Sequence, residues 1–226
     1  MRYKAEMDRR IRNCLIRMKG RIKQYGPGVC LGITSEVSAS VGITSEVAVL
    51  ESFPNSEWGD RRDWCLAVFM FPSEKQATLW YISEPELKQH DFLPPSDSVA
   101  LFCMPLRYLP QPGNLTFNWE EMHNVRSNSF LQKEYIDKVA SLYDAKGVNH
   151  GVIFVQDPGS QNQMKRFKDA WIPYSAHAYC AVHLFESPSA FYDVYHSDKG
   201  SHLRARRAEV CDTLSLLFTV NPNITG

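Results

Sequence analysis

Residues 29–53, VCLGITSEVSASVGITSEVAVLESF, alternate between apolar and polar side chains along most of their length. Apolar residues stand mainly at odd positions, from Val29 through Ile33 and Val41 to Phe53. This period of two is typical of a β-strand with one buried face. A single strand of 25 residues would be about 80 Å long, far beyond the usual length of a strand. We therefore expect the segment to fold back or bend.

The same stretch contains the hexapeptide GITSEV twice, at 32–37 and 42–47. The ten-residue period is even, so a strand would keep equivalent residues of the two copies on one face. A hairpin over 29–53 with the odd loop 38–40 would keep the odd positions inside on both arms, with a longer loop or a kink at Gly42 as the alternatives. The glycines are not spaced like those of a phosphate loop, so the repeat indicates scaffold.

Several other segments are predicted to be strands. WCLAVFMF (64–71) and ATLWYIS (77–83) flank PSEK and predict a second hairpin over 64–83. Apolar runs near 99–109, 150–157 and 177–185 predict three further strands, and the proline-rich residues 84–97 and 110–118 are interpreted as loops.

Helices are predicted mainly in the second half. Ser129 and Gln132 form a capping-box pattern before a helix at 130–146 that Gly147 would end. Ser187-Pro188 opens a short helix, and residues 201–219 are interpreted as a last helix. The order of elements predicts an α+β protein: a mainly antiparallel sheet built from hairpins, a basic N-terminal helix and C-terminal helices.

The N-terminal segment 2–25 predicts a basic amphipathic helix that Gly26-Pro27-Gly28 would end. Residues 1–25 carry nine Lys or Arg against two acids, a charge of +7, although the whole chain has a net charge of zero. We treat 1–25 as a helical arm and 26–226 as one α+β domain. The expected interaction residues are Met7, Ile11, Leu15, Met18, Ile22, Arg9, Arg10, Arg12 and Arg17.

Two interpretations of this helix are open. It packs on its own domain, or it docks on an acidic protein surface, such as that of another copy, because the remaining residues sum to −7. An acidic body repels phosphate, so a nucleic acid partner is possible but not favoured. The second, smaller basic patch LRARR (203–207) is interpreted as a solvated face.

Composition limits the class of protein. The chain is 44% hydrophobic and 12% aromatic, enough for a folded core. It has no apolar run of about 18 residues for a membrane span and no secretory pattern at its charged start. Its six cysteines contain no CxxC, so we expect free thiols and a reducing, cytoplasmic location. The favoured function is a non-enzymatic, self-assembling interaction protein without cofactors, analogous to viral or phage structural or accessory proteins.

A metal-dependent nuclease is the first alternative. Asp63, Glu84, Glu86 and Lys88 would lie near one end of the predicted 64–83 hairpin. This set resembles the Asp…Glu-x-Lys core of PD-(D/E)xK nucleases, which implies carboxylates that bind Mg²⁺ and a lysine that activates water. Pro85 departs from that pattern because it would interrupt the strand that should carry the triplet. The competing interpretation is a set of solvated charges at a hairpin end.

A cysteine-dependent hydrolase is the second alternative. Cys180 and His183 could form a thiol–imidazole pair. On one strand, however, these two positions lie on opposite faces, so local geometry does not bring them together. A buried structural cysteine is the competing interpretation.

Overall fold

The fold is taken from a computed structural model, which describes residues 13–25, 28–34, 47–52, 67–85, 102–105, 110, 115–145, 150–157, 163–167, 171–173 and 179–223. The strands are β1 (Val29–Thr34), β2 (Val47–Glu51), β3 (Ala67–Met70), β4 (Phe102–Cys103), β5 (Leu115–His123), β6 (His150–Gln156), β7 (Lys165–Phe167), β8 (Trp171–Pro173), β9 (Tyr179–Phe185) and β10 (Asp212–Asn221). The helices are residues 13–21, which continue into the 3-10 turn η1 (Ile22–Tyr25), then α2 (Glu74–Ser83), α4 (Asn128–Leu131), the π-helical η4 (Gln132–Ile136), α5 (Asp137–Ala145), α6 (Pro188–Tyr195) and α7 (Asp198–Ala208).

The main sheet has seven strands, and every pairing in it is antiparallel. Its order is β3-β1-β10-β5-β9-β6, and β2 also pairs with β10, on the edge that β1 uses. This arrangement confirms the predicted α+β class with a mainly antiparallel sheet.

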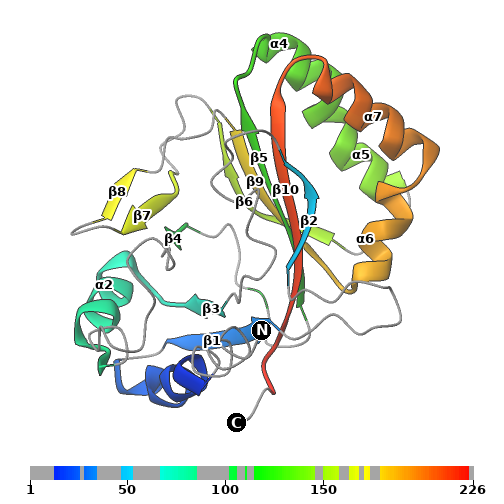
Figure 1. The fold of residues 1–226 in the computed structure, drawn as a ribbon. Helices are drawn as coiled ribbons and strands as arrows, with labels where there is room; N and C mark the ends of the chain where they lie inside the picture. Colours follow the sequence, from blue (N-terminus) through cyan, green and yellow to red (C-terminus); the bar gives the residue numbers. More distant parts are fainter. Residues whose placement is uncertain are drawn as a thin grey trace, which may run out of the picture.

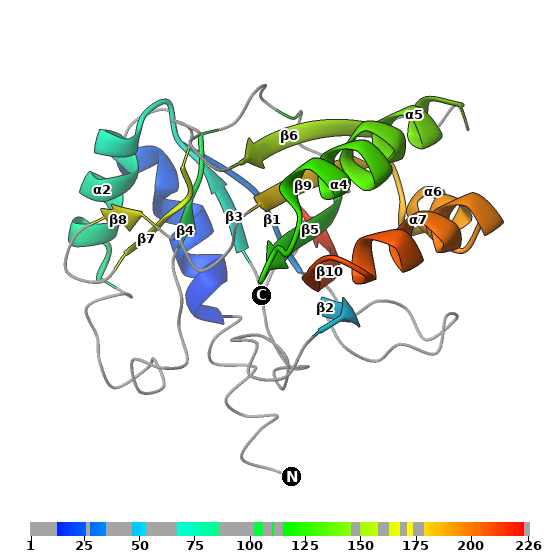
Figure 2. The same ribbon diagram turned by 90° about the horizontal axis from the view of Figure 1, so that it is seen from above.

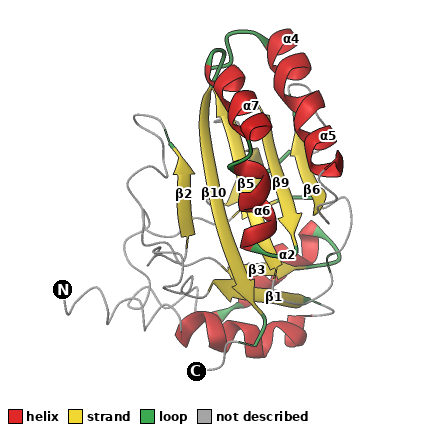
Figure 3. Cartoon of the chain, turned by 90° about the vertical axis from the view of Figure 1, so that its right-hand side faces the viewer, coloured by secondary structure: helices red, strands yellow, loops and turns green. Residues whose placement is uncertain are grey.

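The second half of the chain forms a recognisable unit. Its elements follow the order β5, α4–α5, β6, β9, α6–α7, β10, and its strands lie in the order β10-β5-β9-β6. This is the split β-α-β arrangement known as ferredoxin-like. The helices α4 to α7 cover one face of the sheet (Figures 1 and 3).

The core has two layers, one on each face of the sheet. On the helix side, Leu131, Phe185 and Phe191 are almost fully buried. On the other face, Phe117, Phe154 and Leu216 pack with Met164. The small sheet β4-β7-β8 and the 13–25 helix lie on the side away from α4 to α7 (Figure 2). The strands β5 and β10 are therefore covered on both faces.

The N-terminal helix packs on its own chain. Cys14 and Met18 are each 2% exposed and share a small cluster with Trp80 of α2, and Ile22 is also buried. The predicted apolar face is confirmed at these described positions. Lys19 donates to the carbonyl of Pro222, and Arg21 pairs with the buried carboxylate of Glu84. In the described residues, this face is covered by the same chain.

The predicted hairpin over 29–53 is wrong for the described residues. Its two ends, β1 and β2, pair with β10 in the same direction instead of pairing with each other. Thr34 stands opposite Val220, and Val47 stands opposite Phe218. Val220 and Phe218 are two positions apart on β10 and therefore share a face, yet Thr34 is at an even position of the sequence and Val47 at an odd one. The alternation is thus not kept along the whole segment. The predicted turn at 38–40 lies outside the described residues.

The predicted hairpin over 64–83 is also wrong, because ATLWYIS forms most of α2 rather than a strand. Ser73 caps this helix by accepting a hydrogen bond from the backbone N–H of Gln76. The first arm is a short strand, β3. Side chains of Phe69 and Phe71 pack on Trp80, so the aromatic residues fill a helix–strand interface.

Three further predictions need correction. Residues 115–118, interpreted as loop, begin the long central strand β5. The helix predicted over 201–219 ends at Ala208, and Asp212–Asn221 is the strand β10. The cap of the helix after β5 is Ser127 rather than Ser129, because Ser127 accepts from the N–H of Phe130; the predicted stop at Gly147 is outside the described residues.

Other elements agree with the sequence. The strands near 150–157 and 177–185 are β6 and β9, and only Phe102–Cys103 of the 99–109 run is described as strand. The helix opened by Ser187-Pro188 is α6, with Ser187 as its cap. The thiols of Cys30, Cys180 and Cys211 are free as expected, and these three residues and Cys14 are buried. No described helix has both the length and the apolar content needed to cross a bilayer.

Candidate functional site

A groove of about 450 Å³ runs between α5 and α7 on the outer side of the helical layer. Lys138, Ser141 and Leu142 of α5 and Asp198, Lys199, His202 and Leu203 of α7 line it. Gly200 lets α7 start close to α6, since a side chain there would collide with the carbonyl oxygen of Val194. This corner fixes where α7 runs relative to α5.

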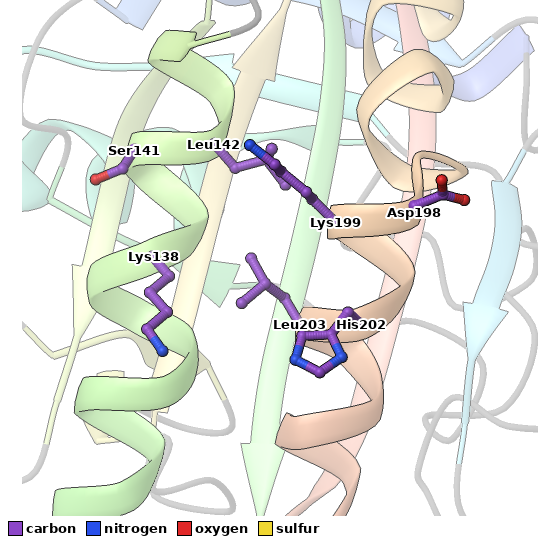
Figure 4. A pocket seen from close by; sticks show the side chains of 7 residues that line it. All are labelled: Lys138, Ser141, Leu142, Asp198, Lys199, His202 and Leu203. Carbon is purple, nitrogen blue, oxygen red and sulfur yellow. The ribbon is translucent and has the colours of Figure 1, made fainter.

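The groove has an apolar floor and polar walls. Leu142 and Leu203 are buried to 6% and 7% exposure and belong to the helix-side core. Figure 4 shows the side chains of Leu142, Lys199 and Leu203 in the space between the two helices, with Lys138 in front of α5 and His202 at the edge of α7, while Ser141 and Asp198 point away. The groove therefore presents hydrocarbon at its base and cationic or titratable groups above it.

The charges along the groove are solvated. Lys138 pairs with Glu134 at 2.8 Å, and the two side chains are 51% and 34% exposed. The hydrogen bond from Lys138 lowers the pKa of Glu134, and the nearby Arg206 and His202 add to this effect. An exposed pair of this kind is weak and can be exchanged for another partner.

A buried polar network lies behind the leucine floor. Arg207, 1% exposed, donates to Glu120 of β5 at 2.9 Å and to the hydroxyl of Tyr135 at 2.6 Å. Its other nitrogen donates to both carboxylate oxygens of Glu51 on β2. Arg204 approaches Glu51 at 4.0 Å. Two arginines thus balance two glutamates, as buried charges require.

The electrostatics of this network favour a charged arginine and neutral phenols. Burial would lower the pKa of Arg207, but Tyr135, Glu120 and Glu51 outweigh it, and the pKa lies well above its ordinary value. Burial raises the pKa of Tyr135 strongly, and burial with Glu51 raises that of Tyr195 to about 12. These features describe a structural clamp that holds α7 on β5 and β2.

The next residue of β5 forms a separate cluster on the opposite face. Glu121, fully buried, accepts from the indole N–H of Trp119 at 2.9 Å and contacts Nε2 of His123 at 3.0 Å. The side chain of His123 is 12% exposed. Among the residues that the structure describes, no three His, Cys, Asp or Glu side chains are grouped so that they could hold a metal ion.

The nuclease candidates are placed only in part. Glu84 follows α2, is fully buried and pairs with Arg21. Asp63, Glu86 and Lys88 lie outside the described residues. The described environment of Glu84 is that of an internal ion pair.

The hydrolase candidates lie in different layers. Cys180 belongs to the cluster on the face away from the helices, whereas His183 contacts the ring of Tyr143 on the helix side. Burial, with Glu121 and Glu120 adding to it, raises the pKa of the Cys180 thiol well above its ordinary value. A buried, protonated thiol without the predicted imidazole is a poor nucleophile.

The interaction candidates divide at residue 13. Met7, Ile11, Arg9, Arg10 and Arg12 lie outside the described residues. Of the others, Met18 and Ile22 are buried, Leu15 is half-buried and Arg17 is exposed. The exposed side of this helix thus carries charge at Arg17.

Sequence reasoning missed the groove and the clamp. Glu120 follows a segment interpreted as loop, and Arg207 belongs to LRARR, whose interpretation as a solvated face is wrong at this residue. The available signal was the period of α7, which places Leu203 and Arg207 one turn apart on the buried face. Neither a family model nor a curated protein sequence matches the chain.

Proposed function

We propose that this chain is an interaction protein whose α5–α7 groove receives an acidic amphipathic helix of a partner protein. The observation that supports this most directly is the groove itself, which combines a leucine floor with Lys138, Lys199 and His202 above it. An amphipathic helix recognises such a surface by placing apolar anchors on the floor and its polar flanks against the walls.

The form of the groove favours a helix over a small molecule. Sites for small ligands usually enclose most of the ligand surface. This groove instead is lined by two neighbouring helices, α5 and α7, on whose ridges a third helix can pack. Glutamates on that helix would meet Lys138 and Lys199, which gives the partner its chemical class.

The probe for this proposal is a fluorescein-labelled helical peptide with leucines at the spacing i, i+3, i+4, i+7 and glutamates elsewhere. Fluorescence anisotropy should show binding that weakens at least about tenfold in the variant K138E/K199E, since each reversal replaces attraction by repulsion. Lys133 is exposed on the preceding turn and does not line the groove, so K133E is the matched control and should change affinity less than about twofold.

Three outcomes contradict the proposal. The acidic peptide could fail to bind, the same peptide with lysines in place of glutamates could bind equally well, or K138E/K199E could bind as tightly as K133E. Binding of decanoate in isothermal titration calorimetry, with no binding of the peptide, would assign the groove to a small amphipathic anion instead.

A second candidate function is self-assembly through the basic N-terminal segment. The charge split supports it, because residues 1–25 carry +7 and the remaining chain −7. Met18 and Ile22 are part of the core, so deletion of the whole helix would remove buried side chains. Deletion of residues 1–12 leaves them in place and should reduce the mass measured by light scattering, whereas an unchanged mass would refute this candidate.

A further inference from the structure

The connection between β1 and β2 is far longer than the sheet requires. Thr34, the last residue of β1, pairs with Val220, and Val47, the first of β2, pairs with Phe218. These ends stand two positions apart on β10 and run in the same direction, so one residue would join them as a continuous strand. The chain places twelve residues, 35–46, between them.

The repeated hexapeptide accounts for most of this excess. Removal of residues 35–44 joins Thr34 to Ser45 and leaves a single GITSEV followed by AVLE. Ser45 and Glu46 would then stand opposite Thr219 alone, which is the two-against-one pattern of a β-bulge. Residues 35–44 are thus an insertion into one edge strand, and the sheet can form without them.

The position beside Asn221 selects for glycine. Gly32 has φ of +154°, and a Cβ there would lie 2.8 Å from the carbonyl carbon and 2.9 Å from the nitrogen of Asn221. Any other residue would be strained and would collide with backbone. In the second copy, Gly42 is followed by the same Ile and Thr, so residues 42–44 meet the same requirement.

We propose that the site between β3 and β10 can be filled by either copy of GITSEV, which gives this edge two registers ten residues apart. The residues before each copy explain why the first copy is used. Leu31 and Cys30 are 1% and 8% exposed, and in the second register Val41 and Ser40 would take their places with less apolar surface. The two copies have the same six side chains and are an even number of residues apart, so pairing through either copy keeps the same side chains on the same face of the sheet.

Substitution of the two glycines tests this proposal. In the full chain, G32V should move the edge to the second register, so the nuclear Overhauser contact of Asn221 with Ile33 is replaced by one with Ile43. G42V should leave the contact and the Tm unchanged. G32V/G42V has no competent copy and should lose both contacts.

The deletion of residues 35–44 provides the background without a second copy. This variant should keep its fold, with a Tm within about 4 °C of the parent, a shift that corresponds to about 1 kcal/mol at this chain length. Adding G32V to it should lower the Tm by more than it does in the full chain. An equal loss of Tm from G32V in the full chain and in the deletion variant would overturn the proposal that the second copy can replace the first. Failure of the deletion variant to fold would overturn the interpretation of residues 35–44 as an insertion.

Discussion

Arg207 is the residue on which the helical layer depends most. It is nearly fully buried and satisfies two carboxylates that come from different strands, Glu120 of β5 and Glu51 of β2. Removing one partner of such a group leaves the opposite charge buried and uncompensated, which costs far more than the pair itself contributes.

We predict that Arg207→Met lowers the free energy of unfolding by about 3–5 kcal/mol in urea titrations. Arg206 precedes it, pairs with Glu209 at the surface and stacks on Phe130 at 4.6 Å. Arg206→Met is the matched control and should cost less than about 1 kcal/mol. Equal losses for the two variants would show that Arg207 acts only through its hydrocarbon stem.

The buried phenols predict alkaline instability. The pKa of Tyr195 is about 12 in the folded chain, against an ordinary value of 10.0, and burial also raises the pKa of Tyr135 and Tyr143. The folded state therefore holds these protons more tightly, and this contribution to stability is complete below pH 10 and lost as the pH rises through the folded values.

We expect the urea midpoint to fall from about pH 10 upward in a titration followed by circular dichroism. Tyr195→Phe should reduce the slope of that decline, because it removes one group with a raised pKa. A midpoint that stays constant to pH 12 would contradict the assignment.

Cys180 should be inert in the native protein. Its thiol is 1% exposed and its pKa is raised by burial and by Glu121, so it should react with Ellman's reagent at pH 8 only as fast as the chain unfolds. Timed alkylation followed by mass spectrometry measures the labelling of Cys180 in the wild type. The variant Cys180→Ser, which has no thiol at this position, is the control. Rapid native labelling of Cys180 would restore the hydrolase hypothesis.

At the scale of elements, the helix after β5 begins at Ser127. The side chain of Ser127 accepts the N–H of Phe130, whereas Ser129 is exposed within the first turn. Ser127→Ala should therefore lower the free energy of unfolding by about 1 kcal/mol, and Ser129→Ala should leave it within about 0.5 kcal/mol. The reverse order, measured in the same urea titration, would assign the cap to Ser129.

Some elements could be predicted from sequence because a local signal and the tertiary environment agree. The α6 helix has its Ser187-Pro188 start, and the N-terminal helix keeps Cys14, Met18 and Ile22 on one buried face. For α2, two local signals conflict. ATLWYIS has the β-branched and aromatic residues of a strand, yet Ser73 and Gln76 form the capping pattern that decides the outcome.

At the scale of the whole molecule, β5 and β10 were missed although both alternate apolar and polar residues along much of their length. Both of their faces are buried. Helices cover one side of these strands and the small sheet with β1 and β3 covers the other. Residues 213–218 of β10 are all buried, and the run TLSLLF has apolar residues at Leu214, Leu216 and Phe218, a period of two that Leu217 interrupts. The strand signal was therefore present, but the leucines also fit the end of the helix predicted over 201–219. The clamp could not be predicted because Glu51, Glu120 and Arg207 meet only through the sheet topology.

The position of β10 has a consequence for synthesis. This strand pairs with β1, β2 and β5, yet its residues follow those of β1 by almost the whole described chain. At about 5–20 residues per second, a ribosome needs on the order of 10–40 s to travel from β1 to the end of β10. Until Asn221 leaves the exit tunnel, β2 lacks its partner in the sheet and β5 has only β9 beside it. During that interval the nascent chain exposes apolar strand edges, which is when a chaperone would engage it.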